Sequence, residues 1–379
     1  MKDGLRIIDC DLHVIENGDL FEKYLDPKFH ADMPKYLGWG PTNFPHWDAG
    51  GQMIPPWARD TAVVGPQQAL DAPSEDIYAP IRDKQYDAPS TLAAMDVEGI
   101  DEAVMFRTFA SMFLSIDSLA GDVATAYCAA FNDWLADYCA EHGPRLRAAA
   151  IVSLHDPELA AAEARRAVED KGHVAVVLLP MPVGGRYVHG SECDVLWQEI
   201  TRLNVPLIFH GTSGGASEDY ASNRFRNHPN FRTLNHASAF PFELMAAMGA
   251  MLVGGVCDRF PDMRVGFLEG NCGWLPWWLD RLDGQWNKYG SGEATQLSAL
   301  PSELFLKQCF IATDSDEALV AQVVDRFGDA NIVMSIDYPH ADGGYPNGIK
   351  EFLGLPGLGL EAKKKIMWEN CRRLYGFAA

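Results

Sequence analysis

Eight short apolar runs, separated by longer amphipathic stretches, are the feature of this sequence that most restricts its fold. The runs lie at Arg6–Cys10, Glu102–Phe106, Ala148–Ser153, Val174–Leu179, Pro206–His210, Arg264–Leu268, Gln308–Thr313 and Ile332–Ile336. Segments with helical periodicity lie between them, such as Val123–Glu141 and Pro157–Lys171. This alternation is typical of βα units around a parallel sheet, and eight parallel strands close into a barrel. The sequence therefore predicts an α/β fold, a (β/α)8 TIM barrel.

The length fits one such barrel with insertions. The chain has 379 residues, of which 47% are hydrophobic, whereas a minimal barrel needs roughly 200 to 250 residues. Residues 35–90 are rich in Pro, Gly, Trp and Asp and show no clear period, so we expect an insertion in the first βα connection, over the barrel mouth or at a subunit contact. A doubly wound open sheet is disfavoured because no GxGxxG follows the first run. We expect residues 1–379 to form a single domain.

Charge and composition restrict the partners. The net charge is −21, with 52 acidic against 31 basic residues and no Lys/Arg-rich run, which argues against nucleic acid. The N-terminus has no signal-peptide pattern, and the longest apolar stretch, Leu244–Cys257, is shorter than the roughly 18 residues of a spanning helix. Eight cysteines without CxxC pairs suit buried thiols in a reducing compartment. We expect a soluble, cytoplasmic protein that acts on a small molecule.

Side chains able to bind a divalent metal stand at the ends of five apolar runs. They are Asp11 and His13 after the first run, His210 at the end of the fifth, and Glu269, Asp314 and Asp337 after the sixth, seventh and eighth. Residues i and i+2 of a strand share a face, so Asp11 and His13 point together. Because a barrel gathers the carboxyl ends of its strands at one mouth, these residues predict a metal site there. A mixture of His and carboxylate without thiolate suits Zn²⁺, Mn²⁺ or Fe²⁺.

Some of these residues also have ordinary structural explanations. Asp314 in "TDSDE" fits a helix cap better than a ligand, Asp11 could cap a turn, and a lone His210 could be a core histidine. The joint occurrence of Asp11, His13, His210 and Asp337 at the right strand ends is what favours the metal interpretation.

Four further residues near these strand ends remain open. His236, in "TLNHASAFP", is a functional candidate placed in a connection. His340 and Asp342, in "DYPHADG", could orient a ligand or form a surface turn. Glu16, three residues after His13, is either a further carboxylate at the mouth or an acid in a helical turn.

Several strings resemble the amidohydrolase superfamily, in particular the amidohydrolase-related group that includes aminocarboxymuconate semialdehyde decarboxylase and γ-resorcylate decarboxylase. They are "IDCDLHVIE", "LIFHGT", "MLVGGVCDRFPDMRVGFLEGNCGWLPWWLDRLD", "SIDYPHADG" and "KKIMWENCRRLYGF", and they extend over nearly the whole chain. The resemblance implies a distorted (β/α)8 barrel with a catalytic metal held by Asp11, His13, His210 and Asp337. The chain departs from the pattern at Asp11, where the family's HxH begins with His, and at Glu269, where the decarboxylases carry His.

The resemblance and the residues together lead us to expect a metal-dependent hydrolase of an amide, ester or thioester of a small organic acid. A metal lowers the pKa of bound water to about 7, which makes hydroxide the nucleophile. Asp337 would be both ligand and base, His236 would polarise the carbonyl, and Glu269 would orient water or protonate the leaving group.

Three alternatives stay open. A nonoxidative decarboxylase of an aromatic or unsaturated acid would use Arg107 to hold the substrate carboxylate. A binuclear iron or iron/manganese enzyme, for thioester hydrolysis or oxygen activation, would add Glu16, His236 and Glu269 as ligands, so one or two ions per chain are possible. A structural subunit of a heteromer is disfavoured by the intact ligand set. The resemblance and the apolar "GWLPWWLDRL" segment suggest a homodimer or larger homo-oligomer, with a heteromer possible.

Overall fold

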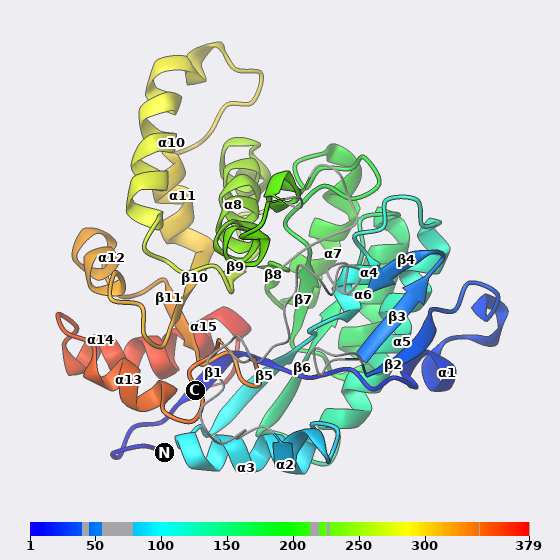
Figure 1. The fold of residues 1–379 in the computed structure, drawn as a ribbon. Coiled ribbons are helices and arrows are strands. Elements are labelled where there is room, and N and C mark those ends of the chain that lie inside the picture. Colours follow the sequence, from blue (N-terminus) through cyan, green and yellow to red (C-terminus); the bar gives the residue numbers. More distant parts are fainter. Residues whose placement is uncertain (40–44, 55–78, 213–219, 226–227, 341, 379) are drawn as a thin grey trace.

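One parallel sheet of eight strands forms the centre of the computed structural model, which describes residues 1–39, 45–54, 79–212, 220–225, 228–340 and 342–378 (Figure 1). In spatial order the strands are β1 (Ile8–His13), β5 (Glu102–Phe106), β6 (Leu146–Ile151), β7 (Ala175–Leu178), β8 (Leu207–His210), β9 (Val265–Leu268), β10 (Cys309–Asp314) and β11 (Ile332–Ser335). All seven ladders between neighbours are parallel. The predicted (β/α)8 barrel is confirmed.

Helices follow the strands and cover the barrel (Figure 1). They are α1 (Leu20–Tyr24), α2 (Ala79–Arg82), α3 (Ala88–Glu98), α4 (Ala110–Phe113), α5 (Gly121–Cys139), α6 (Pro157–Lys171), α7 (Asp194–Leu203), α8 (Phe231–Val253), α9 (Val256–Arg259), α10 (Leu275–Tyr289), α11 (Pro301–Gln308), α12 (Val320–Phe327), α13 (Gly348–Gly354), α14 (Leu360–Lys364) and α15 (Asn370–Tyr375). Helices α10 and α11 project from one end of the barrel (Figure 1).

Local sequence explains why these segments form these elements. Helix α6 begins after Asp156, whose Oδ1 accepts the N–H groups of Glu158 and Leu159, and it ends at Gly172 in a left-handed conformation with φ of 77°. The barrel strands β5, β7, β8, β9 and β11 are buried at every position. Continuous apolar runs are what a parallel sheet covered on both faces requires.

The two end strands, β1 and β11, are not joined by a β-ladder. Polar groups connect them instead: the His13 N–H donates to the Tyr338 carbonyl at 2.8 Å, and the Ile336 N–H donates to Asp9 Oδ2 at 2.9 Å. The barrel is therefore nearly closed, with one seam held by a backbone hydrogen bond and by side chains.

Strand β5 has the predicted bounds, and the ends of the other strands differ from the predicted ones by at most three residues. The first strand was predicted at Arg6–Cys10 but occupies Ile8–His13, so Asp11 and His13 lie inside it, not after it. Asp314 is likewise the last residue of β10. Because the residues at these positions are polar, each of these two apolar runs ends before its strand ends.

Part of the predicted insertion, residues 35–90, is a small antiparallel sheet of β2 (Lys35–Trp39), β3 (Pro45–Ala49) and β4 (Gln52–Ile54). Trp47 is buried against Phe109 and Phe113 on the segment that follows β5, with ring centroids 6.1 and 5.7 Å apart. Residues 40–44 and 55–78 lie outside the described part, so a cover over the mouth or a subunit contact stays a prediction.

Helix α8 is the one described helix whose composition would allow it to cross a membrane. Its segment Thr233–Val253 has a mean hydropathy of 1.3, and half of that window is buried inside the fold. Because α8 directly follows β8 in the chain and contacts α10 and α11, we interpret it as a helix of the barrel.

Candidate metal centre

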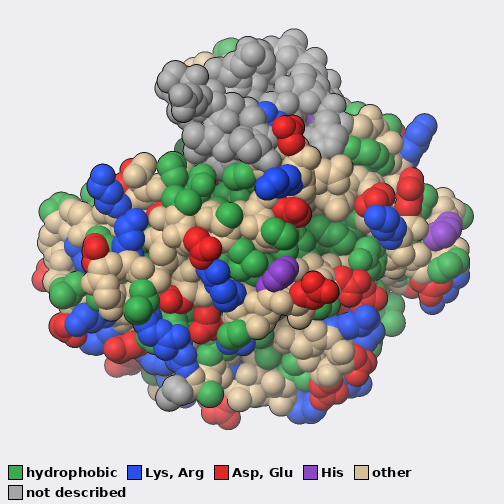
Figure 2. All heavy atoms as spheres, turned by 90° about the horizontal axis from the view of Figure 1, so that it is seen from below, with side chains coloured by type: hydrophobic (Ala, Val, Ile, Leu, Met, Phe, Trp, Pro, Cys, Tyr) green, Lys and Arg blue, Asp and Glu red, His purple; other side chains and the backbone are tan. Residues whose placement is uncertain are grey.

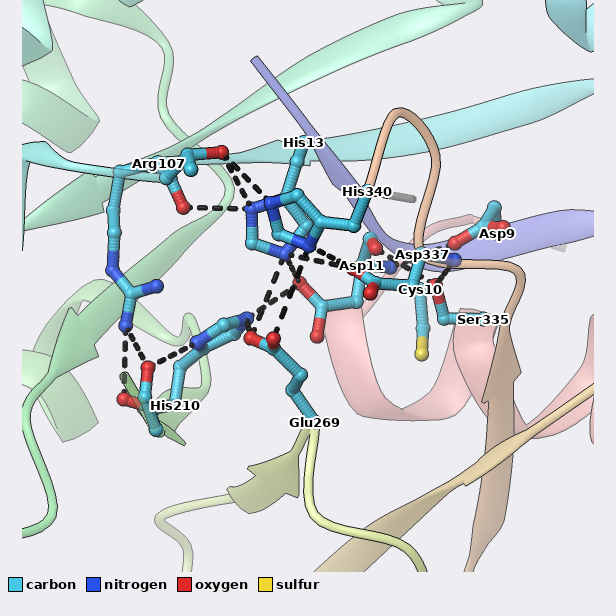
Figure 3. Close-up of polar contacts among 12 residues, drawn as sticks. Asp9, Cys10, Asp11, His13, Arg107, His210, Glu269, Ser335, Asp337 and His340 are labelled. Carbon is cyan, nitrogen blue, oxygen red and sulfur yellow. Dashed lines mark hydrogen bonds and ion pairs between the residues drawn. The ribbon is translucent and has the colours of Figure 1, made fainter. Parts of the chain in front are cut away.

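Six side chains converge at the carboxyl ends of the barrel strands (Figure 3). Strand β1 supplies Asp11 and His13, β8 supplies His210, the residue after β9 is Glu269, and the segment after β11 supplies Asp337 and His340. They form two groups of four, Asp11, His13, His210 and Glu269, and His13, Glu269, Asp337 and His340. Within each group the possible ligand atoms all lie within 4.8 Å of one another.

Backbone geometry turns two of these carboxylates toward the barrel axis. Glu269 and Asp337 have φ values of 54° and 55°, the left-handed region that residues other than glycine rarely adopt. Such conformations cost of order 1 to 3 kcal/mol and concentrate at functional sites, where the surrounding structure holds them.

The separations within the cluster are short. His210 Nε2 lies 3.1 Å from Asp11 Oδ1 and 2.9 Å from Glu269 Oε2. His13 Nε2 lies 3.5 Å from Asp11 Oδ1, 3.4 Å from Asp337 Oδ1 and 3.7 Å from Glu269 Oε2.

The far nitrogen of each histidine is fixed as a donor. His13 Nδ1 lies 2.7 Å from the Arg107 carbonyl and His210 Nδ1 lies 2.9 Å from the Gly211 carbonyl, and a carbonyl can only accept. The Thr108 hydroxyl donates to the Val14 carbonyl, so it accepts from His340 Nε2 at 3.1 Å. The nitrogen that each ring turns toward the carboxylates can therefore carry the lone pair of a metal-binding histidine.

The pKa values show that this arrangement needs positive charge. Burial lowers the pKa of His210, but Asp11 and Glu269 outweigh it and raise that pKa to about 9. Burial likewise opposes protonation of His340, yet Asp337 raises its pKa to about 10. In the free protein, protons on these rings balance the carboxylates, and a metal ion would replace them.

Two of the buried atoms without a hydrogen-bond partner among the described residues belong to the cluster: His13 Nε2 and Asp337 Oδ1, the latter paired with His340 Nδ1 at 2.8 Å as an ion pair. Both point into the cluster and both are typical metal-binding atoms. A set of three imidazole nitrogens and three carboxylates fits a divalent transition metal.

A cavity of about 330 Å³ adjoins the cluster. Glu269 and Asp337 line it, together with Asp314 and with His236 from α8. This volume lies in the range of small-molecule sites, so the cluster faces a space that a substrate could fill.

Glu16, predicted as a possible second-metal ligand, is not in the cluster. Its Oε1 accepts the N–H groups of Thr108, Phe109 and Ala110 at 2.8 to 3.0 Å, and its side chain is buried. The carboxylate therefore holds the turn after β5, and the alternative of an acid that organises a turn is the one the geometry favours.

His236, predicted as a catalytic residue or second-metal ligand in a connection, lies on α8 and outside both ligand groups. Its Nε2 pairs with Asp342 Oδ2 at 3.0 Å, and its side chain is half exposed. Asp342 raises the pKa of His236, which favours its protonated form.

Arg107 does not face the cavity that a substrate would occupy. Its side chain is buried, and Nη2 donates to the His210 and Gly211 carbonyls at 2.9 and 2.7 Å (Figure 3). Nη2 therefore holds the backbone that carries His210, and the predicted contact of Arg107 with a substrate carboxylate stays a prediction.

Asp314 is not a helix cap. It ends β10, its Oδ2 accepts a hydrogen bond from Asn271 Nδ2 at 2.6 Å, and α12 begins six residues later without a side-chain cap. Burial, Glu317 and Glu269 raise its pKa to about 7. Asp314 therefore lines the cavity.

Sequence reasoning missed Asp9 and Ser335, which bind the backbone beside Asp11 and Asp337. Asp9, Asp11 and His13 alternate in "IDCDLH", and that alternation was a signal that Asp9 also points inward. Ser335 carried no comparable signal.

The fold and the cluster agree with the comparison to known families. The sequence profile of the Amidohydrolase family matches residues 8–377. The chain belongs to this family, and it is an enzyme of the amidohydrolase superfamily.

Several curated relatives that this chain resembles in sequence are decarboxylases. Decarboxylase orsB of Emericella nidulans is 24% identical over 65% of this chain and 74% of its own length. The gamma-resorcylate decarboxylase of a Polaromonas species is 23% identical over 74% of this chain and 85% of its own. The structure of 5-carboxyvanillate decarboxylase from Novosphingobium aromaticivorans, solved with manganese and 4-hydroxy-3-methoxy-5-nitrobenzoic acid, has a TM-score of 0.70 at 16% identity and covers 99% of this chain and 97% of that one.

These relatives correct the expected reaction. The sequence led us to expect hydrolysis of an amide, ester or thioester, and this prediction is wrong because the curated relatives are decarboxylases. Glu269 stands where the decarboxylases that the sequence resembles carry His, but one exchanged residue does not define the reaction.

Proposed function

We propose that this protein is a nonoxidative decarboxylase of a hydroxylated aromatic or unsaturated carboxylic acid. One finding carries the choice of reaction: the curated relatives, matched over most of the chain, are decarboxylases. The cluster and the adjoining cavity support a reaction on a small molecule held beside a metal.

We propose manganese as the metal, since related decarboxylases were solved with it. A divalent ion there would supply the positive charge that favours binding of the substrate carboxylate. His13 belongs to both ligand groups, but its Nε2 has a single lone pair and can bind one ion only. We therefore favour one ion per chain. If a second ion were present, Glu269 is the one residue of both groups that could bind both ions.

We assign the proton donor to His236. Decarboxylation replaces the carboxylate of the substrate by a proton, so CO₂ leaves and the ring or alkene carbon needs an acid. His236 lines the cavity, and Asp342 raises its pKa and so favours its protonated form, whereas the oxygens of Asp337 are engaged in the cluster. After His236 has donated its proton, the negative charge of Asp342 favours the transfer of a new proton from water to His236.

The test is CO₂ release from a panel of acids. The manganese-loaded protein would be incubated with 2,6-dihydroxybenzoate, 5-carboxyvanillate and other hydroxylated aromatic acids, next to matched amides and esters. We expect CO₂ in equal amount to the acid consumed and no hydrolysis. Hydrolysis of the esters without CO₂ from any acid would overturn the proposal.

Two variants separate the roles of ligand and proton donor. Asp337→Asn should lose both manganese and CO₂ release. His236→Gln should keep manganese but lower kcat by about 10² or more, the usual contribution of a positioned acid. A His236→Gln enzyme with unchanged kcat would remove His236 from the mechanism.

For the assembly, we propose a cytoplasmic homo-oligomer in which α10 takes part. Trp277 on this projecting helix is 60% exposed and stacks on Trp278. Light scattering on Trp277→Ser should show a smaller particle than the parent, whereas Leu360→Ser, at an equally exposed apolar position, should not. Equal mass for all three would contradict a role of α10.

A further inference from the structure

The seam between β1 and β11 carries side chains whose role the proposed reaction does not explain. β1 contains Asp11 and His13, and the segment after β11 contains Asp337 and His340, so four of the six cluster residues lie at this seam. Elsewhere in the barrel, ladder hydrogen bonds set the distance between neighbouring strands. Between β1 and β11, other hydrogen bonds must set this distance.

Asp9 bridges the seam with both carboxylate oxygens (Figure 3). The pairing of β1 with β5 is irregular between Asp9 and Leu12, and the Asp11 N–H donates to Asp9 Oδ1 at 3.0 Å. Oδ2 of the same carboxylate accepts the Ile336 N–H at 2.9 Å. Asp9 is fully buried, so one rigid group fixes the backbone on both sides.

Ser335 makes a second bridge in the same place. Its hydroxyl donates to the Asp11 carbonyl at 2.7 Å and accepts the Asp337 N–H at 2.8 Å. The two backbone groups of Asp11 are thus held by Asp9 and Ser335, and the N–H groups of Ile336 and Asp337 are held by the same two side chains.

We propose that Asp9 and Ser335 are positioning residues that fix the separation of Asp11 from Asp337, and with it the affinity of the cluster for a divalent metal. The inference rests on the proposed metal centre but not on the reaction it performs. Partners that orient metal ligands without touching the metal typically contribute 10- to 100-fold in metal affinity. Here Asp9 and Ser335 bind the backbone of the ligand residues, across a seam between two strands that no β-ladder joins.

The test measures Mn²⁺ affinity directly. Free Mn²⁺ would be followed by its electron paramagnetic resonance signal during titration of the parent, Asp9→Asn and Ser335→Ala proteins. We expect Kd to rise about tenfold or more in Asp9→Asn, because the amide can accept only one of the two N–H groups. Ser335→Ala should also weaken binding, and the spectrum of bound Mn²⁺ should differ from that of the parent in both variants.

Glu98 offers a matched control. It is also buried, and its two oxygens accept the Gly348 and Ile349 N–H groups at 2.9 and 3.1 Å, away from the cluster. Glu98→Gln should lower the melting temperature yet leave Kd within twofold of the parent. Equal Kd for the parent and the seam variants, or equal weakening in Glu98→Gln, would overturn the inference.

The outcomes separate this inference from the proposals on which it rests. A parent protein that binds no Mn²⁺ refutes the proposed manganese centre and the inference with it. Parent-like binding in the variants refutes only the positioning role. If Asp9→Asn does not fold, Ser335→Ala decides, since it removes only one hydroxyl.

Discussion

At the residue scale, whether a side chain can bind the metal depends on which of its polar atoms already make hydrogen bonds. His13, His210 and His340 each donate their far N–H to an oxygen, which leaves the near nitrogens for the cluster. Glu16, three residues after His13, has the opposite arrangement, because three backbone N–H groups occupy its oxygen Oε1. Residue type alone does not distinguish a ligand from a structural carboxylate, whereas hydrogen-bond partners do.

Glu16→Gln tests that distinction. We expect the variant to bind as much manganese as the parent and to lose about 2 kcal/mol of unfolding free energy, since hydrogen bonds to a charged group are weakened. Metal analysis and urea denaturation measure both quantities, with Asp11→Asn as the variant that should lose metal. Loss of metal in folded Glu16→Gln would return Glu16 to the ligand set.

At the scale of secondary-structure elements, caps and apolar runs made the fold predictable. All eight strands were predicted in the correct order, and the helix predicted at Pro157–Lys171 has those same bounds. The predicted end of β1 was wrong because Asp11 and His13 are polar residues inside a strand. His236 was predicted in a connection, and it lies between β8 and β9 on helix α8, which includes Pro241.

The cap of α6 gives a prediction at this scale. Asp156→Ala should destabilise the protein by about 1 kcal/mol, because two backbone N–H groups lose their acceptor. Asp170→Ala, near the other end of the same helix, should not destabilise it, since an acid near the C-terminus opposes the helix dipole. Chemical denaturation of both variants checks the difference, and equal losses would contradict the cap.

At the scale of the whole molecule, the fold was predictable and the chemistry only in part. The strand ends that carry Asp11, His13, His210, Glu269 and Asp337 meet because a barrel brings them together. The reaction was not predictable, since hydrolysis and decarboxylation use the same ligand types. The net charge of −21 also says little about function: on the face in Figure 2, acidic and basic side chains are interspersed.

The buried His173 should make global stability depend on pH. Burial lowers its pKa from 6.5 to about 4, and its Nε2 donates to the Asn132 carbonyl at 3.0 Å. The unfolded chain therefore takes up this proton first as pH falls. The contribution of His173 to the unfolding free energy is fully present above pH 6.5. It is lost as the pH falls from 6.5 to about 4, and the loss amounts to about 3 kcal/mol.

His173→Gln should lack this loss, because glutamine can donate to the same carbonyl without titrating. The difference in unfolding free energy between parent and variant, measured from pH 4 to 7.5, isolates this one group. A difference that does not change with pH would contradict the assignment.

The central claim is that the six converging side chains hold a divalent metal. Anomalous diffraction at the manganese edge, from crystals grown with Mn²⁺, tests it most directly. We predict one peak within bonding distance of His13 Nε2 and of carboxylate oxygens of the cluster. A protein that binds manganese elsewhere, with no anomalous peak among these six residues, would contradict the claim.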